Sequence, residues 1–567
     1  MIDIKEMIVQ SVSEAIKKAG YEYSGDIGAI LEQPSDSANG DLSLPCFKFA
    51  SVFRTAPPKI ALALKENAVF PSFIKKAENV GGYLNFYFDD SYYLDILDSI
   101  SKDKDFGRSD TGKGKTVCID YSSPNIAKRF HVGHLGTTVI GNAIKNILKF
   151  CSFDVVGINH LGDWGTQFGK LIVAYKLWSS EEKVKERGID ELVDLYVKFC
   201  AEAEKDASLN DEARKAFAKL ETKDEEYMKI WQYFKEISLA EYKKTYDLLG
   251  ITFDSWNGEA FYNDKMDAIV EELKAKGLLI SDNGASIVRL DDYNMPPALI
   301  LKSDGSTLYA TRDITAAIWR KKNYDFYKCL YVTSAGQSLH FAQYFKVIEL
   351  MGYDWAKDLV HIPYGTMSVG GEKLASRTGK VILLDDLFAE AIKKAKKIIE
   401  EKNADLPDKD KTAEAVGVGA VIFWALSNSR IKDSNFSWEE SLSFDGNTGP
   451  YVQYTYARSA SLLRKFDGDT DKAGKYEKGL LPEEKALIKT LSVFPCKVLA
   501  ALNDYEPFII SRYALEVCSA FNVFYHNCGI LRAEEDEKLF RMKLVKSVYG
   551  ILGKCLDLLT IKRTETI

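Results

Sequence analysis

The chain has 567 residues, of which 46% are hydrophobic, 28% are charged and only 14 are proline. This length is far more than a single hydrophobic core usually supports, so we expect about three domains, and the ordinary composition excludes a fibrous or disordered chain. The net charge of −7 argues against a protein that coats nucleic acid through its overall charge, but it allows RNA recognition by local patches.

The sequence predicts no targeting segment and no membrane span. Residues 1–6 are charged at once, unlike the basic and then apolar start of a signal peptide. The nine cysteines are scattered with no C-x-x-C pair, which favours reduced thiols over a disulfide framework or a zinc ribbon. We therefore expect a cytoplasmic protein with no membrane partner and no metal ligand.

In chain order, residues 1–112 are predicted to form a small α/β domain. It begins with an amphipathic helix, passes through a turn at residues 39–41 and contains a strand-like stretch at residues 82–88. The polar, glycine-bearing segment 101–115 is typical of a linker, so we place the domain boundary there.

Residues 113–411 are predicted to form a Rossmann-like domain with a parallel sheet. Strand and helix signals alternate through this region, as in successive βα units. Residues from about 179 to 249 break the alternation, because they are rich in Lys, Glu and Ala with helical periodicity, and we interpret them as a helical insertion. Residues 412–567 are predicted to form an all-helical bundle.

The tetrapeptide His131-Val132-Gly133-His134 is the most informative local feature. It follows a predicted buried strand and precedes an apolar run with helical spacing, so the histidines open a helix. A helix N-terminus offers unpaired N–H groups to phosphates, imidazoles add further donors, and Gly133 leaves room for a planar base. The alternative is a pair of surface or zinc-binding histidines, but only six histidines exist and no cysteine pair lies nearby. We interpret the tetrapeptide as an ATP site.

A second segment, residues 371–380, contains two glycines and carries three cations within eight residues, among them Lys373 and Arg377. Such a loop could close on phosphates and neutralise charge as pyrophosphate leaves. The alternative is a solvated basic turn, which is the usual role of a short charged run. The segment alone does not decide between the two.

A third segment contains Tyr309 and Asp313, which are four residues apart and would share one face of a helix. A carboxylate beside a phenol suits a planar guanidinium, which offers several donors in a fixed fork. The alternative is an N-cap role for Asp313 beside a tyrosine that only packs.

Longer motifs resemble those of class I arginyl-tRNA synthetases of the bacterial type. Residues 122–136, SSPNIAKRFHVGHLG, resemble that family's version of the HIGH signature with its Ser-Pro-Asn lead-in. Residues 159–169, NHLGDWGTQFG, and residues 446–458, GNTGPYVQYTYAR, are similar to two further family blocks. Residues 40–42 and 82–86 resemble blocks of the additional N-terminal domain, with which family members touch the tRNA elbow at its D-loop.

The resemblance implies a two-step ligase. Arginine would attack the α-phosphate of ATP to give arginyl-adenylate and pyrophosphate, and the arginyl group would then pass to the 3′-terminal adenosine of tRNA(Arg). It also implies that Mg²⁺ accompanies ATP, that the C-terminal bundle binds the anticodon, and that arginine activation needs tRNA. The family's common monomer, together with the lack of an obvious heptad seam, favours a monomer.

Family roles carried onto matching positions supply a candidate for each subsite. The proposed catalytic residues are His131, His134, Lys128, Lys373 and Arg377. The proposed ATP contacts are Gly133, His131, His134, Lys128 and Lys373. The proposed arginine contacts are Asp120, Ser123, Asn125, Tyr309, Asp313 and Gln337. The proposed tRNA contacts are Tyr451, Gln453, Tyr454 and Arg458.

The sequence departs from the wider class pattern at three points. The loop that corresponds to the KMSK signature has Ser376 in place of its final lysine, and the resemblance implies that Lys128 supplies the missing cation. Asp120 stands where some relatives carry glutamate, which shortens that side chain by one methylene. Gly136 replaces a family arginine, and we have no account of its effect.

Two other functions remain to be weighed. A non-charging paralogue that binds RNA or arginine as a regulator would show a broken signature, whereas both histidines and the candidate arginine contacts are intact. A small-molecule nucleotidyltransferase would share the histidine signature but would lack the N-terminal domain and the helical C-terminal region. Both observations favour the arginine–tRNA ligase.

Overall fold

The structure is a computed structural model that describes residues 4–34, 36–303, 308–369, 382–470 and 476–567. The chain divides into two compact units. Unit 1 comprises Met1–Lys104, Gly468–Ser492 and Val523–Ser547, and unit 2 comprises Asp105–Asp467, Val493–Asn522 and Val548–Ile567. Each unit has its own buried core.

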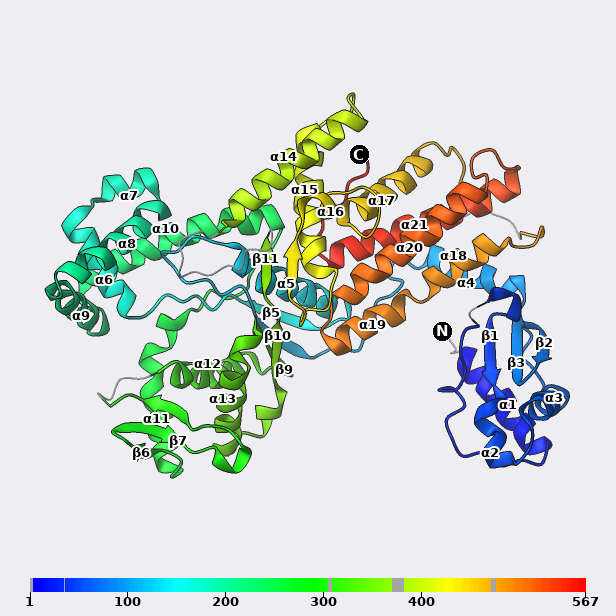
Figure 1. The fold of residues 1–567 in the computed structure, drawn as a ribbon, viewed down its shortest axis with the longest axis horizontal. Helices are drawn as coiled ribbons and strands as arrows, with labels where there is room; N and C mark the ends of the chain where they lie inside the picture. Colours follow the sequence, from blue (N-terminus) through cyan, green and yellow to red (C-terminus); the bar gives the residue numbers. More distant parts are fainter. Residues whose placement is uncertain (1–3, 35, 304–307, 370–381, 471–475) are drawn as a thin grey trace. The chain divides into compact units, whose positions relative to one another are not determined.

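Unit 1 begins with an α/β fold that is blue in Figure 1. Its antiparallel sheet has the order β1-β3-β2, and helices pack on its apolar face around buried side chains such as Ile8, Leu64 and Phe86. The strands are β1 (Leu42–Pro45), β2 (Ile74–Val80) and β3 (Tyr83–Phe88). These helices are α1 (Ile4–Lys18), α2 (Ala50–Phe53) and α3 (Pro57–Asn67). Unit 1 also contains α4 (Asp90–Lys102) and α18 (Pro482–Ser492), which pack against each other.

Unit 2 contains a four-stranded parallel sheet in the order β10-β9-β4-β5. The strands are β4 (Thr116–Asp120), β5 (Asp154–Ile158), β9 (Lys328–Ser334) and β10 (Leu359–Tyr364). Four of the five residues of β4 are buried, as expected for a strand covered on both faces. The helices joined to these strands are α5 (Leu135–Phe150), α12 (Tyr309–Tyr324) and α13 (Ser338–Leu350). This architecture confirms the predicted Rossmann-like fold class.

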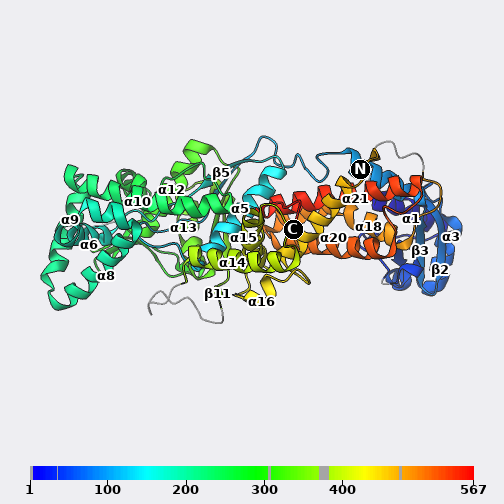
Figure 2. The same ribbon diagram turned by 90° about the horizontal axis from the view of Figure 1, so that it is seen from above.

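A group of helices is inserted after β5. It consists of α6 (Thr166–Trp178), α7 (Glu181–Arg187), α8 (Ile189–Lys205), α9 (Ser208–Glu221) and α10 (Glu225–Leu249). These helices surround a core of their own, which includes Phe168, Phe199 and Phe234. Figures 1 and 2 both show α6, α8, α9 and α10 side by side at one end of unit 2.

A second interruption of the βα alternation was not predicted. After α11 (Met266–Ala275), the strands β6 (Ile280–Asp282), β7 (Ala285–Val288) and β8 (Ala298–Leu301) form a small antiparallel sheet. Asn283 and Gly284 connect β6 to β7 with positive φ values of 49° and 83°. An Asn-Gly pair is a strong local signal for such a hairpin, so the sequence did contain this information.

The C-terminal part of the chain is helical, as predicted, apart from one short strand. Strand β12 (Ser434–Phe436) pairs in parallel with β11 (Met367–Val369) inside the region that we expected to be all helix. The helices are α14 (Leu384–Lys402), α15 (Lys409–Leu426), α16 (Trp438–Ser441), α17 (Gly449–Arg464), α19 (Phe494–Asp504), α20 (Phe508–Asn527) and α21 (Glu535–Leu558). Helices α20 and α21 each run through both units.

One stretch, Pro482–Asp504, is long and apolar enough to span a membrane by length and composition, contrary to our expectation that none would be. The structure divides it into α18 and α19. Several apolar side chains of both helices are buried within the protein, among them Leu487, Leu491 and Val498, whereas Leu499 is exposed. Packing in the protein core therefore accounts for part of the hydrophobicity of this stretch.

Candidate active site

The His131-Val132-Gly133-His134 tetrapeptide forms a reciprocal cap on the short 3₁₀ helix Val132–His134, which leads into α5. The Gly133 N–H donates to Nδ1 of His131 at 3.1 Å, and the His131 N–H donates to Nδ1 of His134 at 3.2 Å. The centres of the two rings are 4.0 Å apart. Because each Nδ1 accepts a hydrogen bond, the neutral ring must carry its proton on Nε2. Each imidazole can therefore offer an Nε2–H donor to a ligand.

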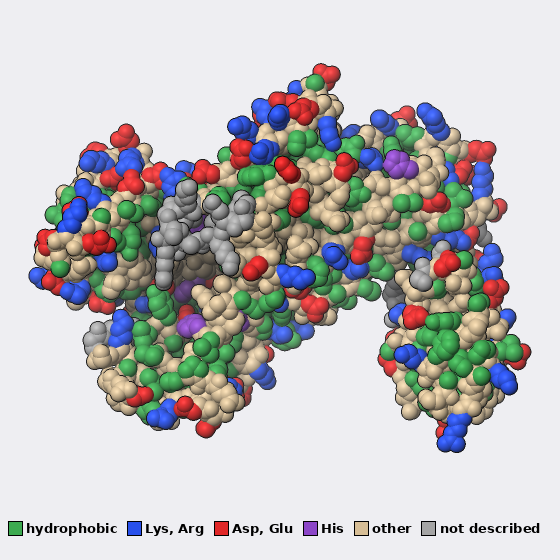
Figure 3. All heavy atoms as spheres, in the orientation of Figure 1, with side chains coloured by type: hydrophobic (Ala, Val, Ile, Leu, Met, Phe, Trp, Pro, Cys, Tyr) green, Lys and Arg blue, Asp and Glu red, His purple; other side chains and the backbone are tan. Residues whose placement is uncertain are grey.

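Both imidazoles are held in the neutral form. Burial lowers the pKa of His134 to about 3, with a smaller contribution from His131. Burial and then the charge of Lys128 lower the pKa of His131. The pair thus contributes hydrogen-bond donors at neutral pH, and Lys128 contributes the positive charge. Figure 3 shows histidine side chains reaching the surface in a hollow of unit 2.

The carboxyl end of β4 carries an internal ion pair that sequence reasoning missed. Nη2 of Arg320 lies 2.7 Å from Oδ2 of Asp120, and the Arg320 side chain is only 1% exposed. The Ser123 hydroxyl donates to the other oxygen of Asp120 at 2.9 Å and accepts from the His160 N–H at 3.2 Å. Each oxygen of Asp120 therefore already accepts from a donor inside the protein. Asp313 and Arg320 are seven residues apart on α12, a spacing that could have indicated a shared face.

The lead-in to the histidines packs against the second family block. A Cβ atom at Gly162 would overlap Oδ1 of Asn125, so a larger residue here would force the Asn125 side chain to move. The Tyr242 hydroxyl, on α10 of the insertion, lies 2.7 Å from the carbonyl oxygens of both Asn125 and Lys128. Asp163, which belongs to the family block at residues 159–169, is completely buried. Its carboxylate lies 2.7 Å from the ammonium group of Lys235, which is on α10 like Tyr242. The insertion thus helps to fix the backbone around the candidate site.

Helix α12 begins at Tyr309, so Asp313 lies in its second turn and is not an N-cap. Oδ2 of Asp313 lies 2.6 Å from Nε2 of His340 on α13. The Tyr309 side chain is 67% exposed, and Gln337 is exposed in the short 3₁₀ helix Ala335–Gln337. These residues are placed by α12 and by the turn that follows β9. Lys373 and Arg377 lie outside the described residues.

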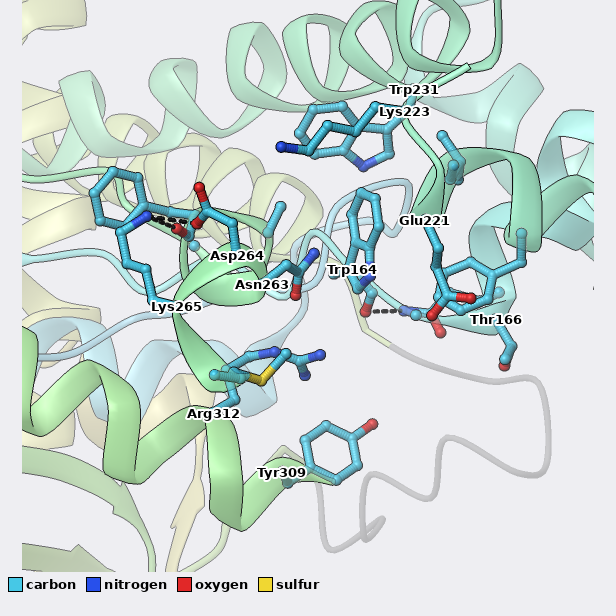
Figure 4. Close-up of a pocket in the computed structure, with 18 of the residues that line it drawn as sticks. Trp164, Thr166, Glu221, Lys223, Trp231, Asn263, Asp264, Lys265, Tyr309 and Arg312 are labelled. Carbon is cyan, nitrogen blue, oxygen red and sulfur yellow. Dashed lines mark hydrogen bonds and ion pairs between the residues drawn. The ribbon is translucent and has the colours of Figure 1, made fainter. Parts of the chain in front are cut away.

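A cavity of about 1040 Å³ opens beside Tyr309, between the insertion and α12. In Figure 4, Tyr309 and Arg312 line one side, and Trp164 and Trp231 lie across from them. Its aromatic side chains are Trp164, Phe217, Trp231, Trp256, Phe261 and Tyr309. Its basic side chains are Arg214, Lys223, Lys235, Lys265, Lys302 and Arg312, against three acidic ones, Glu221, Asp264 and Asp267. The cavity is a basic and aromatic surface, and Tyr309 is the one predicted arginine contact among its lining residues.

The four predicted tRNA contacts lie on α17 but do not share one environment. Nη1 of Arg458 lies 2.8 Å from Oδ1 of Asn522, whose Nδ2 donates to the Tyr451 hydroxyl at 2.6 Å, and the guanidinium lies 4.8 Å from the centre of the Tyr454 ring. Gln453 is completely buried, and its amide donates to the carbonyl oxygens of Ala415 and Lys562. The prediction for Gln453 is wrong, because this amide holds the bundle together and does not reach the surface.

Comparison with known families decides the identity of the fold. Residues 96–438 match the family described as tRNA synthetases class I (R), catalytic domain. Residues 452–567 match the DALR anticodon binding domain, and residues 6–88 match the arginyl tRNA synthetase N terminal domain. The chain belongs to the arginyl-tRNA synthetase family.

Known arginyl-tRNA synthetases are similar over their whole length. The chain is 48% identical to an arginine–tRNA ligase of Clostridium botulinum and 48% identical to one of Halothermothrix orenii, with 100% of each chain covered. It also resembles the solved arginyl-tRNA synthetases of Thermus thermophilus, with a TM-score of 0.79, and Plasmodium falciparum, with a TM-score of 0.80, each at 25% identity. These alignments cover 100% of this chain and 100% and 99% of the two structures. The resemblance indicated by the motifs is confirmed.

The buried ion pair between Asp120 and Arg320 leads to a prediction about stability. In Arg320→Met, the buried Asp120 carboxylate loses its cation, so we expect unfolding of unit 2 to become easier by about 3 kcal/mol or more. All eight tryptophans lie in unit 2, so urea unfolding followed by tryptophan fluorescence measures this unit. The matched control is Lys229→Met, which removes an exposed pair with Glu225 and should leave the midpoint unchanged. Equal midpoints for the two variants would contradict the role of the buried pair.

The neutral histidine at residue 134 makes a prediction about pH. An unfolded chain protonates this imidazole below about pH 6.5, whereas the folded chain keeps it neutral to about pH 3. The unfolded state binds more protons in this window, so the histidine makes stability fall as the pH drops below about 6.5. In His134→Asn, the side-chain oxygen can still accept from the His131 N–H. On going from pH 7 to pH 5, the free energy of unfolding should fall in both proteins, and we expect the fall to be about 2 kcal/mol smaller in this variant than in the parent. The same fluorescence measurement tests this. An identical loss would contradict the prediction.

Proposed function

We propose that the chain is an arginine–tRNA ligase that activates L-arginine with ATP and then transfers it to the 3′-terminal adenosine of tRNA(Arg). The observation that carries the proposal is the presence of all three family domains in one chain with an intact histidine tetrapeptide at the start of α5. The relatives that match over their full length are named as ligases, and no finding favours the non-charging paralogue.

The ATP end of the site is proposed to consist of His131, His134, Gly133 and Lys128. Neutral imidazoles with Nε2–H donors can hold phosphate oxygens without strong hydration of their own, while Lys128 balances the charge. As the arginine carboxylate attacks the α-phosphate, the bond to pyrophosphate breaks and negative charge accumulates on the leaving group. We further propose Lys373 and Arg377, from the segment outside the described residues, as cations for that charge.

The arginine end is proposed to consist of Ser123 and Asn125 at the amino-acid backbone and of Tyr309, Asp313 and Gln337 around the side chain. Asp313 supplies the carboxylate that a guanidinium needs, since a planar fork matches two carboxylate oxygens better than an ammonium group does. We revise the role of Asp120. Since its oxygens already accept from Arg320 and Ser123, we propose that it acts mainly by positioning Ser123.

The transfer step requires single-stranded nucleotides to reach the activated arginine. We propose that the basic and aromatic cavity beside Tyr309 receives the 3′ end of the tRNA, since stacking on aromatic rings and attraction to cations are the means by which proteins hold single strands. The hydroxyl oxygen of the terminal ribose would then attack the arginyl carbonyl carbon, and AMP would leave. Tyr451, Tyr454 and Arg458 remain our proposed contacts on α17.

Three further properties belong to the proposal. Mg²⁺ prefers oxygen ligands, and the donors at the histidine tetrapeptide are nitrogens, so the residues at this site do not form a cage for it and we infer that Mg²⁺ enters with the ATP phosphates. All nine cysteines are free and seven are buried, which fits a reducing compartment such as the cytoplasm. We infer a monomer from the resemblance to the family.

The test of the function is aminoacylation of a tRNA pool with arginine, lysine or citrulline. We expect arginine to be charged, with kcat/KM at least about a thousandfold higher than for either analogue, because each analogue leaves the Asp313 carboxylate poorly paired. Citrulline, which has nearly the same shape without the charge, is the sharpest competitor. Charging with citrulline, or no charging with arginine, would overturn the assignment.

The cavity can be tested through two exposed lysines in its lining, Lys223 and Lys302. In Lys223→Gln and Lys302→Gln, we expect a higher KM for tRNA and a slope of log KM against log salt that is lower by about 1 for each lysine. The KM values for arginine and ATP should not change. The control, Lys276→Gln, removes an exposed lysine that does not line the cavity. If the cavity variants behaved like this control, the tRNA path would be elsewhere.

A further inference from the structure

We propose that His340 is a positioning residue for Asp313, and that the charge on its imidazole controls how tightly the site binds the guanidinium of arginine. This inference rests on the proposed function, because it takes Asp313 as the partner of the substrate side chain. Sequence reasoning did not single out His340, and nothing in the family comparison assigns it a role.

The contact between the two residues is close and accessible. Helices α12 and α13 bring Nε2 of His340 to 2.6 Å from Oδ2 of Asp313, and the side chains are 33% and 31% exposed. The Asp120–Arg320 pair, by contrast, is sealed from solvent. Solvent access means that the imidazole can exchange protons, and that a ligand can reach the same carboxylate.

A neutral His340 prepares Asp313 for the substrate. Its Nε2–H donates to Oδ2, which fixes the plane of the carboxylate but leaves Oδ1 and the remaining lone pairs available, since a carboxylate has about four acceptor sites. A guanidinium can then bind to an oriented carboxylate that keeps its full negative charge. The arrangement therefore favours binding of the arginine guanidinium only when the histidine is uncharged.

A protonated His340 weakens binding of the substrate side chain. It places a positive charge beside the position that the guanidinium must occupy, and it already satisfies part of the charge of Asp313. By linkage, arginine binding and proton binding at His340 must weaken each other by the same factor. Varying the pH is therefore the direct way to test this competition.

The other titratable groups around the pair differ in behaviour. Tyr344 on α13 and His160 stay neutral near pH 7, because burial raises the pKa of Tyr344 and lowers the pKa of His160. Tyr331 of β9, which packs on Tyr344, is also neutral because burial raises its pKa. Glu259 is different. It pairs with Arg312 at 3.2 Å, interacts with Asp313, and has a pKa that burial raises to about 7. Its titration must be separated from any effect of residue 340.

The experiment measures KM for arginine and KM for ATP in tRNA charging by the full chain from pH 6 to pH 8. For the parent protein, we expect KM for arginine to rise about tenfold on going from pH 8 to pH 6, with little change in KM for ATP. His340→Gln keeps a donor without a charge, so it should match the parent within about twofold at pH 8 and lose most of the rise. His340→Leu removes both the donor and the charge, so it should raise KM for arginine above the parent's value at pH 8 and show no rise toward pH 6. Glu259→Gln should keep the His340-dependent rise.

Two controls make the outcomes distinct. His526→Gln removes an exposed imidazole from α20 and should leave the whole profile unchanged. Asp313→Asn tests the proposed function itself: if it left KM for arginine unchanged, the assignment of Asp313 would fail. If Asp313→Asn weakened arginine while His340→Gln kept the parent's pH profile, or His340→Leu matched the parent at pH 8, the inference about His340 alone would be overturned.

Discussion

The buried pair between Asp120 and Arg320 is the constraint on which the rest of the candidate site depends. It joins the carboxyl end of β4 to α12, and these are the elements that carry Ser123 on one side and Asp313 on the other. An ion pair so deeply buried tolerates little displacement, because each charge has lost most of its water and depends on its partner and on the few polar groups around it. The two ends of a substrate amino acid would thus be held at a separation set by the protein interior.

Charge is distributed unevenly across the site, and the distribution suits its two substrates. At the start of α5 the donors are neutral imidazoles, so a triphosphate at the proposed site would meet hydrogen bonds and a small number of cations. Around Asp313 the opposite holds, since the proposed site offers a carboxylate to a cation, with His340 as its immediate neighbour. Burial decides the first arrangement and solvent access the second, although both use the same side chain, histidine.

The sequence allowed prediction of those parts of the fold and the site that are encoded locally. The strand before the histidines, the helix after them and the shared helix of Tyr309 and Asp313 follow from apolar periodicity and spacing. Arg320, His340 and Tyr242 were missed, because their roles arise from contacts with residues far away in the chain. Gln453 shows the reverse error, since motif membership does not reveal which side chains of a helix point inward. The antiparallel strands β6–β8 were missed although their Asn-Gly turn was visible.

The close packing of Gly162 against Asn125 has a consequence for substitutions at residue 162. A side chain there would meet the amide oxygen of Asn125, so the Asn125 side chain would have to move before residue 162 could be enlarged. The constraint runs in one direction, since a glycine at residue 162 leaves residue 125 free to change. Enlarging residue 162 would therefore displace a proposed substrate contact that lies 37 residues away in the chain.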